Sequence, residues 1–562
     1  MTFVLGLILA SAPASAQDAA EGAIDPALYV DITPDGFDAI AGVIPALLPS
    51  EVAIPDTSQE VVDIWFCAED FSLTNGLVGL QVIDAQVTPG NGALDVTASL
   101  MVSVNSSGNP FNLSFSGCVD SDCPGYVDAF PVDIHTTIAL AIVPGPDGLD
   151  VLDATVGAID VSYVLDNSDI HLDCFVQDIE DILGYVGLSI YDLIIDQVDS
   201  LLQDQIGALA PTLESTVEDA FSAATIDQDL DLNGATAHIS LAPTDIQVLP
   251  TGVRLAMGGW VSGDAAACVS AYDTGGPTWT ENGLADIGYA PTGVRSPYHL
   301  GIGVSDDFAN QTLYTLWRGG LLCYTLAPGG VFPLDTSIMN LLTGNVFAEL
   351  FPESQPVTMR TVPRAAPTVD YTGSDDINVT LKDLDVELYA DLDGRAARIV
   401  SVSLNGPAGA NLALDGGTGN LGIAVHIDPA NLVPTVVYNE IYPDQDATVE
   451  SSFATAFGGL LDTLIGGLVG DALAFALPSI SGLGLQSLET SATGPSQDWL
   501  GAYAMLGSVT YGDGSSCGGC GGTDTGGSSS SGCSSGCAQA PGVPAWMGLL
   551  PLGLAVVLRR RP

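Results

Sequence analysis

Carboxylates and histidines are the side chains of this sequence that could take part in acid–base chemistry. The chain has 68 Asp and Glu residues, so adjacent pairs such as Asp306-Asp307 and Asp375-Asp376 follow from composition and single out no acid/base pair. An isolated histidine in a strand-like context is more often a packed or surface side chain than a ligand. The five histidines all stand in such contexts: His135, His171, His238, His299 and His426.

No nucleophile or cofactor motif accompanies these side chains. The body of the chain, before Gly512, contains no G-x-S-x-G elbow, no H-E-x-x-H and no phosphate-binding loop. Its one G-x-G-x-x-G match, at 417–422, lies among strand-like runs rather than at the start of a helix, so it is no dinucleotide fingerprint. The acidic run at 227–234 could bind calcium weakly, but it lacks the EF-hand spacing. We therefore expect no catalytic residue, no metal site, no cofactor and no enzymatic activity.

The balance of charge is strongly acidic. Only 11 basic residues oppose the acidic ones, the formal net charge is -57, and Lys382 is the only lysine. Such a field repels the phosphates of nucleic acids and anionic lipid headgroups, so we expect no nucleic-acid partner. A solvated acidic surface explains the charge most simply, and adaptation to high salt or divalent cations is the alternative.

The first 16 residues resemble a secretory signal peptide. A short apolar core precedes Ala14-Ser15-Ala16, a small-residue cleavage site. Export makes disulfides permissible. Six body cysteines are candidates, and they allow fifteen pairings: Cys67, Cys118, Cys123, Cys174, Cys268 and Cys323. We favour Cys268 with Cys323, because these two are alone in the second half.

A Gly/Ser-rich tract at 512–538 predicts a flexible linker that cannot bury a core. Its four cysteines could hold zinc, but no ordered scaffold surrounds them: Cys517, Cys520, Cys533 and Cys537. The final segment, 539–562, contains an apolar run from Ala545 to Leu558, shorter than the roughly twenty residues of a stable membrane span. Three arginines follow it: Arg559, Arg560 and Arg561.

Cysteines, apolar run and terminal arginines together resemble the MYXO-CTERM sorting tail of myxobacteria. The resemblance implies that sorting machinery of the protease or transpeptidase kind cuts near Cys533 or Cys537, with Cys537 preferred, and attaches the protein to the surface. A plain carboxyl-terminal membrane anchor is the alternative. Both predict an exported protein at the outer membrane, on the cell surface or outside the cell.

Two long amphipathic helices are the main elements predicted for the body. Apolar residues recur every three or four positions from Ser189 to Phe221 and again from Val449 to Leu468. Pro211 should kink or restart the first helix. The simplest explanation of each apolar stripe is a packed core.

Strands fill most of the remaining body. Apolar residues alternate with period two at 94–104 and 384–392, and turn signals lie at 89–92, 105–110 and 144–148. Each half of the body therefore has the same order: a strand, a helix, further strands and a long helix.

Four segments resemble the lipopolysaccharide-binding and bactericidal/permeability-increasing proteins of the TULIP lipid-binding superfamily. Residues 29–56 resemble the first strand and helix of that family, with Thr33 as the N-cap and a helix ending at Pro49. Residues 299–326 resemble the opening of its second barrel, 347–363 its short helix and following strand, and 498–511 its last strand. The similarity spans about residues 25–511.

The resemblance implies an α+β fold with two elongated barrel-and-long-helix domains, joined by a central antiparallel sheet into a boomerang. The expected divisions are 17–225, 226–275 for the connection and central sheet, and 276–511. Each barrel would hold acyl chains in an apolar cavity. The candidate lining residues are Phe37, Ile40, Ile44, Leu47, Leu201, Ile206, Leu209, Leu213, Phe308, Leu313, Phe453, Phe457, Leu460 and Leu464.

Two features depart from the family. Its bactericidal members bind lipopolysaccharide through a basic surface, whereas the clustered cations here are few and lie in the second half: Arg318, Arg360, Arg364, Arg395 and Arg398. The family's disulfide between the long amino-terminal helix and a strand has no evident counterpart, because this helix contains no cysteine.

The sequence therefore predicts a secreted, surface-attached protein that binds or transfers phospholipid or another acyl lipid. The alternative is a structural or adhesive surface protein whose barrels are filled by their own side chains. The volume beneath the two stripes distinguishes these functions, because ligand pockets usually measure several hundred cubic ångströms.

Overall fold

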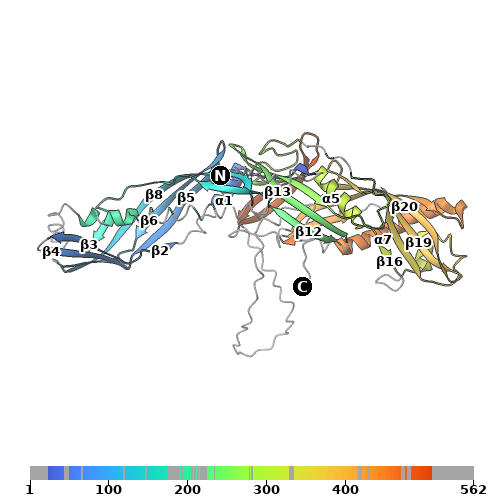
Figure 1. Cartoon of the computed structure of the whole chain (residues 1–562), viewed down its shortest axis with the longest axis horizontal. Helices are drawn as coiled ribbons and strands as arrows, with labels where there is room; N and C mark the ends of the chain where they lie inside the picture. Colours follow the sequence, from blue (N-terminus) through green and yellow to red (C-terminus); the bar gives the residue numbers. More distant parts are fainter. Residues whose placement is uncertain are drawn as a thin grey trace, which may run out of the picture.

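In the computed structural model, three β-sheets lie in a row along an elongated molecule (Figure 1). We call the ten-stranded sheet at one end the N-terminal arm and the eight-stranded sheet at the other end the C-terminal arm, each with the helices on it. The boomerang shape and the domain limits remain predictions. The structure describes residues 23–42, 50–64, 67–117, 120–145, 148–174, 189–192, 194–200, 203, 207, 211, 214, 225–232, 235–276, 279, 283–327, 334–415, 420–426, 431–469, 475–476 and 483–508.

The central sheet has seven strands and brings distant parts of the chain together. Its strands, in spatial order, are β12 (Ile226–Leu232), β13 (Ala235–Leu249), β14 (Gly252–Ser262), β1 (Ile24–Ile32), β15 (Leu300–Ser305), β25 (Trp499–Ser508) and β24 (Leu483–Thr493). Strand β1 pairs antiparallel with both β14 and β15, and β15 pairs with β25. Strand β25, in the segment that resembles the family's last strand, therefore returns to the central sheet.

The N-terminal arm is built on the long strand β8 (Ser121–Pro144). The main path of its sheet is β2 (Glu51–Ala53), β5 (Leu77–Pro89), β6 (Ala93–Val104), β8, β7 (Phe111–Ser116), β4 (Cys67–Thr74) and β3 (Thr57–Ile64). Three short strands pair with β8 off this path: β9 (Asp150–Val156), β10 (Asp160–Tyr163) and β11 (Ile170–Leu172).

The C-terminal arm is built on β19 and β20. Its strands are β16 (Thr325–Leu326), β17 (Val357–Pro363), β19 (Ile377–Leu392), β20 (Arg395–Asp415), β21 (Asn420–His426) and β23 (Phe475–Ala476), with β18 (Thr368–Asp370) on β19 and β22 (Val433–Tyr438) on β20. The predicted strand at 384–392 is confirmed as the second part of β19.

The first helix, α1 (Pro34–Ala41), begins as the sequence predicted. Thr33 is the N-cap, and its side chain accepts a hydrogen bond from the Gly36 backbone N–H at 3.3 Å. Gly36 is required there, because a Cβ would lie 2.2 Å from the carbonyl oxygen of His299. The rest of the helix predicted to Pro49 lies outside the described residues.

Helices cover the sheets. Helix α5 (Asp306–Arg318) follows β15, and α6 (Thr336–Leu342) and α7 (Asp446–Val469) belong to the C-terminal arm, with a 3-10 turn at Pro443–Gln445 before α7. In the N-terminal arm, residues 190–192, 194–200, 203, 207, 211 and 214 are helical. Pro211 is itself helical.

Strands β13 and β14 form a hairpin that turns at 250–251. One predicted segment differs in detail. The short helix expected within 347–363 lies earlier, as α6. Residues 343–350 form turns instead, with both Gly344 and Asn345 at positive φ, a conformation that ends a helix.

Candidate functional site

The interface between the helix and the sheet of the N-terminal arm is the first candidate site. Ile190, Ile194 and Val198 of the helix are at most 5% exposed and pack on the inner faces of the strands. The strand side of this core is rich in aromatic residues from β4, β7 and β8: Phe71, Phe111, Phe115 and Phe130. The described part of the predicted apolar stripe, from Ile190 to Val198, therefore faces the sheet.

A cavity of about 20 Å³ lies between this helix and the strands. Eight of its nine lining residues are apolar, and Gln197 is the polar one. That volume holds about one water molecule. The apolar side chains that surround it are Ile54, Phe71, Leu73, Val104, Phe111, Leu113, Ile194 and Val198.

Polar contacts fasten the helix to the short outer strands of the same arm. The Tyr163 hydroxyl on β10 donates a hydrogen bond of 2.6 Å to Asp199. Burial, followed by this contact, raises the pKa of Tyr163, so the phenol remains a donor at neutral pH. The backbone N–H of Val156 on β9 donates a bond of 2.9 Å to Glu214 Oε1.

The C-terminal arm repeats this arrangement with α7. Val449, Phe453 and Phe457 are at most 4% exposed, and the rings of the two phenylalanines stack with centroids 4.8 Å apart. They pack with Phe347 and with the apolar face of β19 and β20. The predicted helix from Val449 to Leu468 is confirmed.

Polar contacts also fasten the start of α7. The backbone N–H of Val436 on β22 donates a hydrogen bond of 2.9 Å to Glu450 Oε1. The Asn439 side-chain amide donates to Asp446 at 2.8 Å and to the Tyr442 carbonyl at 2.7 Å. Each arm thus has a helix glutamate that accepts a strand backbone amide.

The predicted lining residues are distributed over several cores. Phe453 and Phe457 lie beneath α7, in the core of the C-terminal arm. Phe37 and Phe308 are buried with the central sheet, and Leu313 packs in a small cluster beside it. Ile40 is half-buried on α1. The side chains outside the described residues are Ile44, Leu47, Leu201, Ile206, Leu209, Leu213, Leu460 and Leu464.

Sequence reasoning missed the strand side of both interfaces. Alternation at Phe111, Leu113 and Phe115 marks the buried face of β7 and could have identified it. Glu214 and Glu450 were indistinguishable from the other acidic residues of the helices. No local pattern indicates which carboxylate meets a strand amide.

A buried ion pair lies in the central sheet and was also missed. The Arg254 guanidinium donates two hydrogen bonds of 2.6 Å to the Asp31 carboxylate and a third to the Ala285 carbonyl. It also lies 4.6 Å from the ring centroid of Tyr29. Burial raises the pKa of Asp31 above its ordinary value, although the bonds from Arg254 oppose this shift.

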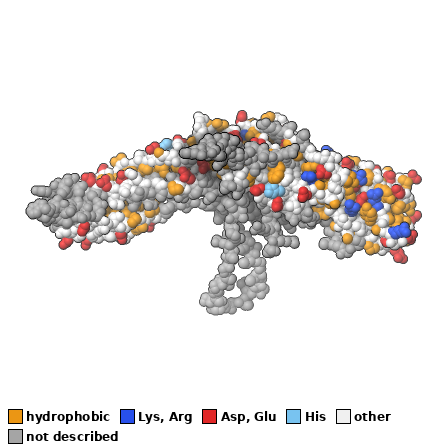
Figure 2. Space-filling view, viewed as in Figure 1, with side chains coloured by type: hydrophobic (Ala, Val, Ile, Leu, Met, Phe, Trp, Pro, Cys, Tyr) orange, Lys and Arg blue, Asp and Glu red, His pale blue; other side chains and the backbone are white. Residues whose placement is uncertain are grey.

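Permanent positive charge begins at Arg254, well along the chain. No Lys or Arg precedes Arg254, so the N-terminal arm carries carboxylates and a few histidines but no permanent cation. Figure 2 shows the Lys and Arg side chains mainly over the end that carries β19 and β20. Three of those arginines are neutralised locally by acidic side chains, in the pairs Arg318–Asp273, Arg364–Asp385 and Arg398–Glu387.

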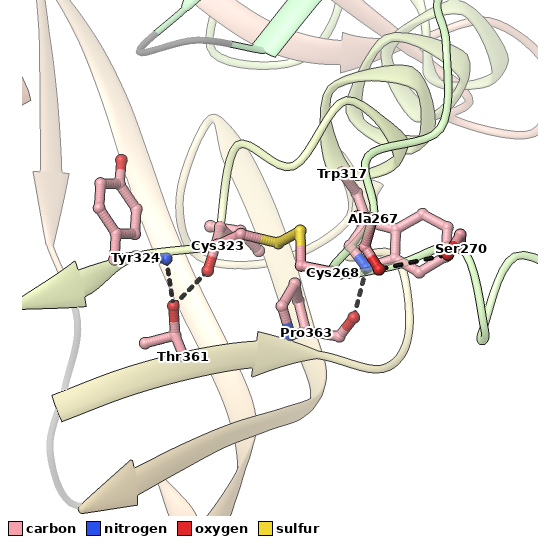
Figure 3. Close-up of a disulfide and its surroundings, with 9 residues drawn as sticks. Ala267, Cys268, Ser270, Trp317, Cys323, Tyr324, Thr361 and Pro363 are labelled. Carbon is pink, nitrogen blue, oxygen red and sulfur yellow. Dashed lines mark hydrogen bonds between the residues drawn. A yellow bond between two sulfur atoms is a disulfide. The ribbon is translucent and has the colours of Figure 1, made fainter. Parts of the chain in front are cut away.

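Two disulfides are present among the described residues. Cys268–Cys323 is confirmed as predicted, and it links the segment after β14 to the segment after α5, beside Trp317 and Pro363 (Figure 3). Cys123–Cys174 ties β8 to the segment that leads toward the long helix. The side chains of Cys67 and Cys118 lie outside the described residues.

Within the described part of the chain, no group of three or more His, Cys, Asp or Glu residues could hold a metal ion. None of the described helices is long and apolar enough to span a membrane. The signal peptide, the cysteine-bearing linker and the arginine tail (1–16, 512–538 and 539–562) lie outside the described residues.

A comparison with protein-family models found no match, and neither did a comparison with curated proteins. Among solved structures, a lipopolysaccharide binding protein matches at TM-score 0.43 and 12% identity, over 87% of this chain and 100% of that one. P47 of Clostridium botulinum E1 matches at TM-score 0.23 and 8% identity, over 86% and 99%. Takeout 1 of Epiphyas postvittana matches at TM-score 0.19 and 12% identity, over 32% and 90%. Since all three TM-scores are below 0.5, the function of this chain has to be inferred from its own residues.

Proposed function

We propose that this protein binds lipids and holds their acyl chains between the long helix and the sheet of each arm. No step of bond chemistry belongs to this function. The protein would act by taking acyl chains out of water, which is favourable by about 0.8 kcal/mol for each buried methylene.

The observation that carries the proposal is the composition of the interface in the N-terminal arm. The space beneath Ile194 and Val198 is enclosed almost entirely by aliphatic and aromatic side chains. Those side chains come from separate layers, a helix and a sheet, that are tied at their margin by a few hydrogen bonds. Such a surface accepts a hydrocarbon chain and offers no partner to a polar ligand.

Charge predicts which headgroups are accepted. The N-terminal arm has no Lys or Arg to pair with a phosphate or carboxylate. An anionic headgroup at that arm would meet only like charges, which disfavours it. We therefore expect lipids without net negative charge to bind more tightly than anionic ones.

The size of the cavity favours the alternative function. A volume of about 20 Å³ is far below the roughly 300–1,000 Å³ of usual ligand pockets. A rigid interface of this kind would make this described part of the N-terminal arm solid, as a structural or adhesive surface protein requires. Lipid binding beneath Ile194 and Val198 therefore requires the helix and sheet to separate there.

Lipid extraction from the full-length protein, purified without detergent and analysed by mass spectrometry, tests the two functions. One or two acyl lipids per chain support lipid binding. A lipid-free protein that also fails to take up a fluorescent fatty acid would contradict it and favour the structural function.

Export and surface attachment form the second part of the proposal. Two disulfides suit an oxidising compartment. We expect the mature protein to begin after Ala16 and to be attached through Cys537, with loss of Arg559–Arg561. Mass spectrometry of the cell-surface fraction checks both ends, and an intact tail would support a plain membrane anchor instead.

A further inference from the structure

The same contact recurs in both arms at the margin between helix and sheet. Glu214 accepts the Val156 backbone N–H in the N-terminal arm, and Glu450 accepts the Val436 backbone N–H in the C-terminal arm, both at 2.9 Å. The two strands concerned are peripheral: β9 pairs with β8 and β22 pairs with β20. In each arm the helix carboxylate therefore occupies the position of a missing neighbouring strand.

This contact has a clear physical basis. The outer edge of a peripheral strand exposes backbone N–H groups that have no strand partner. A carboxylate accepts such a group in a charge-assisted hydrogen bond, which is stronger than a bond between neutral groups. The bond holds one point of the helix against one point of the strand, beside the apolar packing of the interface.

A second bond strengthens the margin in the N-terminal arm. The Tyr163 hydroxyl reaches from β10 to Asp199 at 2.6 Å. The ring of Tyr163 packs against the core beneath the helix, next to Phe130 at a centroid distance of 5.7 Å. The hydroxyl therefore connects the helix to β10, and packing in the core beneath the helix fixes the Tyr163 ring.

The narrow cavity determines how a chain must enter. A space of about 20 Å³ beneath Ile194 and Val198 admits no acyl chain until the helix and the sheet move apart. Any parting along this margin breaks the bonds of Tyr163 and Glu214 in the N-terminal arm. In the C-terminal arm it breaks the bond of Glu450.

We propose that Tyr163 with Asp199, Glu214 and Glu450 are latch residues, which control the rate at which acyl chains enter and leave between each helix and its peripheral strand. The inference rests on the proposed lipid binding. The latches re-form over the bound chain, so loosening them speeds uptake and release together and leaves the equilibrium affinity almost unchanged. Because each arm has its own latch residues, each arm takes up its acyl chain independently of the other.

Stopped-flow uptake of a fluorescent 16-carbon fatty acid by the full-length protein tests this. Tyr163→Phe removes one hydroxyl and keeps the ring, and we expect uptake and release in one kinetic phase to become about tenfold faster. Tyr314→Phe is the matched control. It removes a similar tyrosine bond of 2.5 Å to Asp273, away from both margins, and should leave both phases unchanged.

The C-terminal latch has its own pair of variants. Glu450→Met removes the acceptor and should accelerate the other phase by a similar factor. Glu450→Gln keeps a carbonyl oxygen for the Val436 N–H and should restore most of the original rate. If Glu450→Met lowers the unfolding temperature greatly, Tyr163→Phe alone still decides the inference for the N-terminal arm.

The failures are distinguishable. A wild-type protein that takes up no fatty acid overturns lipid binding and the latches with it. A protein that binds fatty acid, but whose Tyr163→Phe and Glu450→Met variants load at the wild-type rate, keeps the proposed function and overturns the latches. An affinity change without faster exchange also overturns them, because it identifies these residues as ligand contacts.

Discussion

Among the described residues, one part of the N-terminal sheet shares an apolar cluster with the central sheet, whereas the main cluster of the C-terminal sheet is separate from it. The other part of the N-terminal arm, beneath its helix, also has a cluster of its own. Leu94, Ile138 and Leu152 of the N-terminal arm belong to one cluster with Ile239 and Leu241 of the central sheet. In the C-terminal arm the main cluster is separate, and Leu412 and Leu414 reach the central one only as partly buried neighbours.

We call the contact region between the C-terminal arm and the central sheet the joint of that arm. It is held by a small apolar cluster, a hydrogen bond and a disulfide. A small cluster of Val369, Tyr371 and Leu500 lies between it and the central sheet. Thr490 of β24 donates a hydrogen bond of 2.5 Å to Asp376, and the Cys268–Cys323 disulfide links the segment after β14 to the segment before β16. A continuous core makes two regions unfold together, while a joint of this kind lets one region open alone.

Removal of Arg254 should have the largest effect and should act on both arms. Strand β1 lies between β14 and β15, and Arg254→Met leaves Asp31 buried without its partner. We expect a loss of about 3–5 kcal/mol at pH 7. Thermal unfolding with hydrogen exchange in each arm measures the loss and its extent.

The pH dependence of this loss has a definite sign. Burial already raises the pKa of Asp31, so the folded state holds that proton more tightly than the unfolded state does. Such a group stabilises the fold below the ordinary carboxyl pKa, and this stabilisation is lost as pH rises through the folded value. Arg254→Met should therefore be least stable at neutral pH and recover toward pH 4. An Asp31→Asn/Arg254→Met protein no more stable than the single variant would contradict this.

The two disulfides should stabilise the fold by similar amounts, but removing each should change hydrogen exchange in a different region. They close loops with sequence separations of 51 and 55 residues, so chain entropy predicts about 4 kcal/mol for each. The double substitution Cys268→Ser/Cys323→Ser should raise hydrogen exchange at the joint of the C-terminal arm. The same change at Cys123 and Cys174 should act within the N-terminal arm, and an identical exchange pattern for both would remove the distinction between the arms.

A matched pair of core truncations tests the continuity of the cores. Leu241 and Leu404 are each at most 1% exposed, and they lie in the central and C-terminal clusters respectively. Each Leu→Ala change should cost about 3 kcal/mol. Leu241→Ala should lower protection from exchange in the central sheet and in the adjoining parts of β6, β8 and β9, and Leu404→Ala only in the C-terminal arm. If both substitutions lowered protection from exchange over the same regions, the molecule would unfold as a single cooperative unit.

The smallest effect is expected at the polar part of the joint. Thr490→Val removes the bond to Asp376 while keeping the shape of the side chain, and should cost about 1.5 kcal/mol. Thr490→Ser keeps the hydroxyl and serves as the control. Exchange at β24 and at residues 375–379 should rise in the first variant, and no rise there would assign the joint to apolar packing and the disulfide.

Local patterns predicted the elements well, because capping and periodicity are local. Thr33 before α1, the alternation within β6 and the apolar stripe of α7 each needed only a few consecutive residues. The long-range contacts were beyond such reasoning. Asp31 and Arg254 are 223 positions apart, and their pairing depends on the register of β1 with β14.

The candidate site was predicted from one side only. The helix stripes were found because their period is plain, but six cysteines could not reveal that Cys123 pairs with Cys174. The sequence does not distinguish Glu214 and Glu450 from the other acidic residues of their helices. Their role depends on which strand lies at the margin, and that is decided by the topology of the sheet rather than by the neighbours of each glutamate.

The absence of Lys and Arg before Arg254 also has a consequence for digestion by trypsin, which cuts after these residues. Arg254 is only 4% exposed in the folded protein, and Arg295 is the next basic residue and is exposed. Trypsin should therefore leave the whole N-terminal arm and most of the central sheet in one fragment, even when that arm is locally open. A protease that cuts beside acidic residues would detect local openings of the N-terminal arm that trypsin cannot detect.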